Sequence, residues 1–129
     1  MEGSEPEQLT RELLARLDAR DFSAISAMMA DDVQGVDEIS RGWLRGRSAA
    51  EEYFRTALAN VFDIHSSLSD VSVVETGDVG IVTAMLSQSY TQEGRSVSVE
   101  APTSVVFLRR ASDWKIALVH SVPLPEDRS

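Results

Sequence analysis

Hydrophobic residues recur at helical spacing in the first part of the chain. Three segments show this pattern: "SEPEQLTRELLARLDAR" (4–20), "FSAISAMMA" (22–30) and "AAEEYFRTALANVF" (49–62). Each follows or begins with a side chain that typically caps a helix N-terminus, namely Ser4, Asp21 and Ser48. We therefore expect three helices, each with an apolar stripe that faces a core.

Strand-like patterns surround and follow these helices. Val33 and Val36 indicate a short strand, and "RGWLRGR" reads as a glycine-punctuated turn or an edge strand. Beyond residue 62 four apolar or alternating segments follow one another: "IHSSLSDVSVVE", "IVTAMLSQSYT", "RSVSVEAPTSVVFLRR" and "WKIALVHSV". The turns "TGDVG", "QEG" and "ASD" separate them, which is typical of an antiparallel meander. Pro102 suggests a bulge or an edge position in the third. Helices followed by a sheet predict the α+β class.

The strands are apolar on both faces. Ile81 and Met85 alternate with Val82, Ala84 and Leu86, although three helices can cover only one face. Either the sheet curls around its own interior, or a second subunit covers its outside. The second alternative predicts a homodimer through the sheet, because a patch of that size exceeds what monomers usually expose.

The last strand ends its apolar face in an imidazole. Strict alternation puts Trp114, Ile116, Leu118 and His120 on one face. His120 is then either a strand-end residue that reaches water or one of the few polar groups of a cavity lined by this face.

Length, charge and composition narrow the classes of partner. The 129 residues suit one domain over 1–129, with 1–3 and 125–129 expected to be loose. A net charge of −9 disfavours nucleic acid and anionic membranes as partners. The absence of cysteine excludes disulfides, thiolate metal sites and cysteine nucleophiles. No apolar run is long enough to span a membrane, and the acidic start is unlike a secretory signal, so we expect a cytoplasmic protein.

Four stretches together resemble a known family. They are "LARLDARDFSAISAMMADDV", "RGRSAAEEYF", "GDVGIVTAMLS" and "TSVVFLRRASDWKIALVHSVPLP", and they resemble the SnoaL-like families of the nuclear transport factor 2-like superfamily, which also holds ketosteroid isomerases. The likeness covers residues 7–125. It implies three helices packed in the concave face of a strongly curved antiparallel or mixed sheet, a cone with a central pocket. Such folds host isomerases, cyclases, dehydratases and hydrolases as well as binding or dimerisation modules.

The resemblance also assigns residues. It places Asp37 at the general base of the ketosteroid isomerases. Their oxyanion hole uses a helix tyrosine and a protonated strand aspartate, which here read Leu13 and Ser104. Because oxyanion donors are often the largest catalytic contribution, steroid isomerisation of that type is not expected.

Each candidate site residue has a plainer alternative. Asp37 is a base in an apolar pocket or a solvated loop residue beside Glu38, and His120 is an acid–base group or a structural histidine. Four further residues are ligand-binding candidates: Trp43, Tyr53, His65 and Tyr90. The tyrosines are equally core residues, and Trp43 either walls the pocket or covers a helix. The spacing of His65, His120 and Asp37 matches no metal motif, so we expect no metal and no cofactor.

Two functions follow from this reasoning. The first is a cofactor-free isomerase, cyclase or lyase that acts on a small apolar molecule, with Asp37 as base, His120 as a second acid–base or orienting group and Trp43 as a wall. The alternative is a non-catalytic ligand-binding or dimerisation module with the same pocket, which the missing oxyanion donors favour. A third possibility, a scaffold that recognises proteins through its sheet, has no distinguishing residue.

Overall fold

The computed structural model describes residues 4–125 and consists of three α-helices and one six-stranded sheet within that range. The elements are α1 (Glu5–Asp18), α2 (Phe22–Met28), β1 (Met29–Val36), β2 (Leu44–Arg45), α3 (Arg47–Thr56), a 3-10 turn (Leu58–Asn60), β3 (Val61–Thr76), β4 (Val79–Gln92), β5 (Arg95–Arg110) and β6 (Asp113–Ser121). The ends that we expected to be loose lie, except for Pro125, outside the described residues. The α+β prediction is confirmed.

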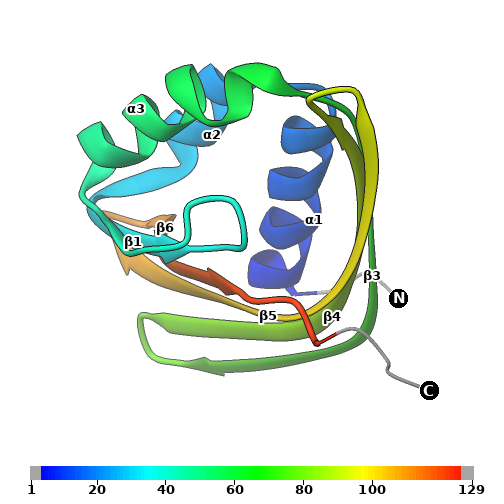
Figure 1. Cartoon of the computed structure of the whole chain (residues 1–129). Coiled ribbons are helices and arrows are strands. Elements are labelled where there is room, and N and C mark those ends of the chain that lie inside the picture. Colours follow the sequence, from blue (N-terminus) through cyan, green and yellow to red (C-terminus); the bar gives the residue numbers. More distant parts are fainter. Residues whose placement is uncertain (1–3, 126–129) are drawn as a thin grey trace.

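The sheet is open and strongly curved. Its strand order is β2-β1-β6-β5-β4-β3, and every neighbouring pair is antiparallel except β1 and β6, which run parallel. Figure 1 shows the long strands β3–β5 bending around α1, while α2 and α3 lie across the opening of the curve. The helices therefore pack on the concave side, and the convex side faces outward. None of the helices between residues 4 and 125 is long and apolar enough to cross a membrane.

Two of the three predicted N-capping residues, Ser4 and Asp21, cap a helix in the structure. The Ser4 side chain accepts the N–H of Glu7 at 3.3 Å, and the Asp21 carboxylate accepts that of Ala24 at 3.2 Å. The prediction that Ser48 caps α3 is wrong, because this helix begins at Arg47. Gly46 takes the cap position at φ +90°, a conformation that suits glycine, and its N–H bonds the carbonyl of Val33 at 2.7 Å.

Two expected helix ends also differ. The second helix stops at Met28, because Met29 is already extended and starts β1. The third stops at Thr56, and the chain passes through the 3-10 turn into β3, where Val61 is buried. The short strand that Val33 and Val36 predicted is confirmed, and "RGWLRGR" contributes the edge strand β2.

The meander and its turns are confirmed. β3, β4, β5 and β6 pair in sequence, with Gly77, Gly94 and Ser112 at positive φ between them. The pairing of β5 with β6 ends at Thr103, which pairs with Ser121. At the adjacent Pro102, β5 therefore has only one neighbouring strand, β4. This is an edge position of the kind that proline tolerates.

A bulge in β6 reverses the expected orientation of His120. Phe107 pairs with Ile116 whereas Val106 pairs with Leu118, so Ala117 is an extra residue without a partner. Trp114 and Ile116 are buried on the concave side, but after the bulge it is Val119 and Ser121 that turn inward. The prediction that His120 shares the face of Trp114 is therefore wrong.

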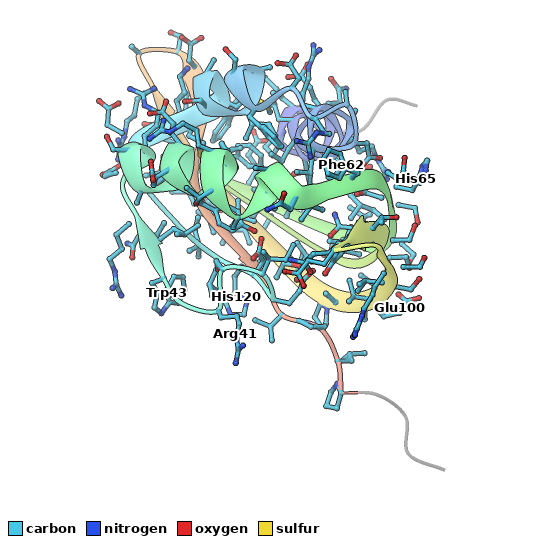
Figure 2. All side chains as sticks on the ribbon, turned by 45° about the horizontal axis from the view of Figure 1, so that its top comes forward. Arg41, Trp43, Phe62, His65, Glu100 and His120 are labelled. Atoms are coloured by element: carbon cyan, nitrogen blue, oxygen red, sulfur yellow. The ribbon has the colours of Figure 1, made fainter. Side chains whose placement is uncertain are left out.

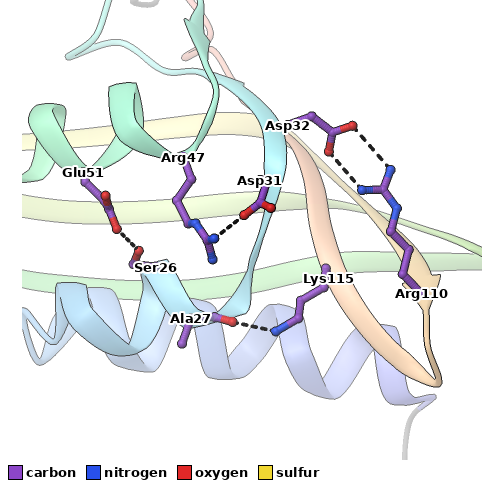
Figure 3. A network of polar contacts seen from close by, with 8 residues as sticks. All are labelled: Ser26, Ala27, Asp31, Asp32, Arg47, Glu51, Arg110 and Lys115. Atoms are coloured by element: carbon purple, nitrogen blue, oxygen red, sulfur yellow. Dashed lines mark hydrogen bonds and ion pairs between the residues drawn. The ribbon is translucent and has the colours of Figure 1, made fainter.

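Polar contacts join α2, α3 and the strands beside them (Figure 3). The Ser26 hydroxyl of α2 bonds Glu51 of α3, Arg47 pairs with Asp31, Arg110 pairs with Asp32 at 3.1 Å, and Lys115 donates to the carbonyl of Ala27 at 2.8 Å. Exposed pairs such as these contribute little energy individually. Together they connect α2 to α3, α3 to β1, α2 to β6 and β5 to β1.

Candidate functional site

A cavity lies between the helices and the concave face of the sheet. Its volume is about 150 Å³, and its walls come from all three helices, from β1 and from β3–β6. Most of the lining is aliphatic or aromatic: Leu13, Leu14, Leu17, Ile25, Met29, Val33, Phe54, Leu58, Leu68, Leu86, Val105, Ile116 and Val119. A dry apolar cavity of this size holds a molecule about as large as benzene. The cavity thus has room for one small apolar body.

Asp37 lies directly after β1 and lines this cavity. Its Oδ1 accepts the N–H of Ile39 at 3.0 Å and that of Ser40 at 2.7 Å, which closes a tight turn. The same carboxylate lies on the cavity wall, where the hydroxyl of the buried Tyr53 bonds it. Asp37 therefore combines a structural role in the turn with a position on the cavity wall.

Tyr53 of α3 binds the Asp37 carboxylate directly. Its hydroxyl lies 2.7 Å from Oδ2 and 2.9 Å from Oδ1, and the side chain is buried. Burial, and then the negative charge of Asp37, raise the pKa of Tyr53 far above its usual value. The phenol consequently stays protonated and donates a hydrogen bond to the carboxylate.

Glu38 and Tyr90 form a second carboxyl–phenol pair beside the first. The Tyr90 hydroxyl is 3.4 Å from Oε1 of Glu38, and Glu38 lines the cavity. Burial, and to a smaller degree the charge of Asp37, raise the pKa of Glu38. Burial, and then the charge of Glu38, raise the pKa of Tyr90 to about 12. A carboxyl group with a raised pKa can give up and accept a proton closer to neutral pH than an exposed one.

The structure brings only some of the sequence candidates together. Asp37 and Tyr53 line the cavity, and Tyr90 is buried next to Glu38. His120 lies on the convex face beside Trp43, with their ring centroids 6.0 Å apart, and neither is among the cavity-lining residues. Figure 2 shows these two side chains next to each other, with His65 far from them at another edge.

His65 and Ser104 also lie outside the cavity. His65 borders a shallow polar groove on the convex face together with Ser67, Ser87 and Ser89. Ser104 pairs with His120 across β5 and β6, so it faces outward too. The hydroxyls that face the cavity from these two strands belong instead to Thr103 and Ser121, which lie 2.9 Å apart.

Glu38 is not among the site residues that the sequence predicts, where it stands only as a solvated neighbour of Asp37. The partner of Glu38 is 52 residues away in β4, so no local spacing connects them. The one available signal was a pair of adjacent acids directly after the short strand that Val33 and Val36 predict.

Replacing Glu38 by Gln tests the burial of this carboxyl group. Because the folded state binds the Glu38 proton more tightly, Glu38 stabilises the fold fully below its ordinary pKa of 4.5, and this contribution is lost as pH rises through the raised folded-state pKa. We expect Glu38→Gln to melt at a higher temperature than the parent at neutral pH, with a difference that disappears in acid. Thermal unfolding across pH measures this, with the exposed Glu75→Gln as control. A variant less stable than the parent at neutral pH would contradict a desolvated Glu38.

Comparison with known proteins gives one family and many similar folds. The family model of the SnoaL-like domain matches residues 7–125. No curated protein matches the chain by sequence.

Among solved structures, a proposed dehydratase of the NTF2-like family from Streptomyces avermitilis is 22% identical, with a TM-score of 0.84 over 95% of this chain and 96% of that one. The S. rosetta CaMKII hub is 20% identical, with a TM-score of 0.80 over 96% and 100%. A ketosteroid isomerase-like protein from Erwinia carotovora atroseptica is 18% identical, with a TM-score of 0.79 over 93% and 94%. At these identities the likeness concerns the fold alone.

Proposed function

Since this chain belongs to the SnoaL-like domain family, we propose that it binds a small, largely apolar molecule in the cavity, with the polar part of that molecule at Asp37 and Glu38. The observation that carries this proposal is a largely apolar cavity whose wall includes two carboxyl groups, each bonded by a tyrosine hydroxyl. Apolar walls supply affinity, and a few fixed polar groups orient the ligand.

Proton transfer by this carboxyl pair is the second candidate function. The resemblance to ketosteroid isomerases implies Asp37 as base, but two backbone N–H groups and the Tyr53 hydroxyl already bond its carboxylate. Glu38 has the freer carboxyl group, and its raised pKa suits a base near neutral pH. We therefore propose Glu38 as the proton acceptor of a cofactor-free isomerase, cyclase or lyase, with Asp37 and Tyr53 orienting the substrate. His120, outside the cavity, has no part in this step.

Small aromatic probes test the binding proposal. Toluene and benzyl alcohol match the size of the cavity, and a ligand that binds only the folded state raises its melting temperature. We expect both probes to raise the melting temperature and to shift the NMR signals of cavity methyl groups such as those of Val105. Val119→Phe fills the cavity and should abolish both effects, whereas Val74→Phe, on an exposed part of β3, should preserve them. No response of the parent protein at millimolar probe would contradict the proposal.

We also propose a homodimer through the convex face of the sheet. This face carries Ile81 on β4, Val106 on β5 and Leu118 on β6, and Ile81 is 37% exposed. No element within residues 4–125 covers it (Figure 1). A second copy of the chain would remove this apolar surface from water.

Val106→Lys should convert the dimer to a monomer, because it places a charge in the centre of the proposed interface. Ser98→Lys is the matched control: it lies on the same strand and the same face, but in the polar groove near His65. Light scattering at micromolar concentration should report a dimer for the parent and for Ser98→Lys, and a monomer for Val106→Lys. A monomeric parent protein would refute the interface.

A further inference from the structure

We infer that the molecule bound in the cavity carries a protonated amine on an apolar body about the size of one aromatic ring. This inference rests on the proposed function, because it names the chemical class of the ligand of that same cavity. It follows from the distribution of charge around the cavity, together with its volume of about 150 Å³.

The cavity wall carries acidic groups but no basic ones. Asp37 and Glu38 are among its lining residues, whereas no lysine, arginine or histidine of the described chain is. A carboxylate or phosphate ligand would therefore meet two groups of its own sign without a counter-ion, and this repulsion disfavours its binding in a partly desolvated site. An ammonium group would meet two acceptors of opposite sign. The net charge of −9 also favours a cationic ligand, since it attracts cations towards the protein.

The two carboxyl groups also lack a cationic partner within the protein. None of the ion pairs among residues 4–125 includes Asp37 or Glu38. The two arginines nearest in sequence have other neighbours. Arg45 bonds the Gln34 side chain, and its guanidinium carbon lies 5.8 Å from the centre of the Trp43 ring. Figure 2 places Arg41 on the same outer side as Trp43. Partly buried carboxylates are normally paired with a positive charge. Here both carboxyl groups line the cavity, so a ligand in the cavity can supply that charge.

The tyrosine hydroxyls are compatible with an ammonium ligand. Each phenol donates its proton to a carboxylate, Tyr53 to Asp37 and Tyr90 to Glu38, and each phenol oxygen keeps a lone pair that can accept a hydrogen bond. An ammonium group has three N–H donors, so it can be satisfied by the two carboxylates and a phenol oxygen. The rest of the cavity offers aliphatic and aromatic contacts that suit an alkyl or aryl body.

Four probes of one size separate charge from shape: benzylamine, benzyl alcohol, benzoate and toluene. Titrations followed by NMR at mildly alkaline pH keep Glu38 ionised and benzylamine protonated. We expect benzylamine to bind at least about tenfold more tightly than benzyl alcohol, the ratio typical of one charge-assisted hydrogen bond, and benzoate to bind most weakly. Glu38→Gln should remove most of the preference for the amine, and Glu75→Gln should keep it. Asp37→Asn serves as a second test that does not depend on the folding of Glu38→Gln.

Each outcome decides between the two proposals. Equal affinity for benzylamine and benzyl alcohol, or tighter binding of benzoate, would overturn the amine inference and leave the apolar-ligand proposal intact. An amine preference that survives in both Glu38→Gln and Asp37→Asn would also overturn it, because the preference would then arise elsewhere. Failure of all four probes to bind would overturn both proposals together.

Discussion

Trp114→Ala is expected to lower the free energy of unfolding by about 3–5 kcal/mol, the range found when a buried large aromatic side chain is truncated. Trp114 is 7% exposed and belongs to the main core cluster, with the guanidinium carbon of Arg109 4.7 Å from its ring. The packing around it is close. A Cβ added at Gly80 would lie 3.6 Å from the indole and 2.8 Å from the Pro6 ring, so the first turn of α1, the indole and β4 leave no space between them.

The other tryptophan provides a matched control for this prediction. Trp43 is 47% exposed, and its truncation to alanine should cost less than about 1 kcal/mol, as most surface substitutions do. Chemical denaturation of Trp114→Ala, Trp43→Ala and the parent protein measures both values. Equal losses for the two tryptophans would contradict the described core.

Asp37→Ala is expected to destabilise the fold by about 2–4 kcal/mol, because it removes one acceptor that serves three donors. The N–H groups of Ile39 and Ser40 and the hydroxyl of Tyr53 would all lose their partner, and the Tyr53 side chain is buried. Asp37→Asn keeps an oxygen for the two N–H groups and an amide beside the phenol. It should therefore cost less than about 1 kcal/mol.

The pair of variants separates the structural role of Asp37 from a role in ligand chemistry. Urea denaturation gives the stability of each variant, and titration with benzylamine gives its affinity. If Asp37 acts only in the turn, Asp37→Asn should retain both stability and affinity. If it also contributes charge to the cavity, Asp37→Asn should keep the stability and lose affinity. Equal destabilisation by Asn and Ala would show that the carboxylate charge itself holds the turn.

Local patterns predicted most of the fold. The caps Ser4 and Asp21 mark real helix starts because a cap acts within three residues of itself. The meander was predictable from the sequence because strands joined by short turns usually pair with each other. The parallel pairing of β1 with β6 was not predictable from local patterns, since it joins residues such as Val36 and His120 that are far apart in the chain. Gly46 was missed as a cap because its contribution is a backbone angle rather than a side chain.

The site was predictable only in part, for the same physical reason. Asp37 and Tyr53 were named from the resemblance and from side-chain type, and the structure places both on the cavity wall. Their catalytic and binding roles stay predictions. His120 was assigned to the inner face by strict alternation, which fails because β6 has a bulge at Ala117. The bulge was not predictable, since an alanine fits a regular strand as well as a bulge. The contact between Glu38 and Tyr90 depends on the curvature of the whole sheet, and no short motif encodes it.

The bulge in β6 also bears on how relatives of this chain can vary in length. With Ala117 present, the strand carries one residue more than its partner β5 needs between Ile116 and Leu118. Loss of one codon at this point would leave a regular strand in which Val119 and Ser121 still face the interior. The same loss in a strand without a bulge would turn every following side chain to the opposite face. Position 117 is therefore a place where evolution, or a protein engineer, can shorten the strand without altering the residues that line the cavity.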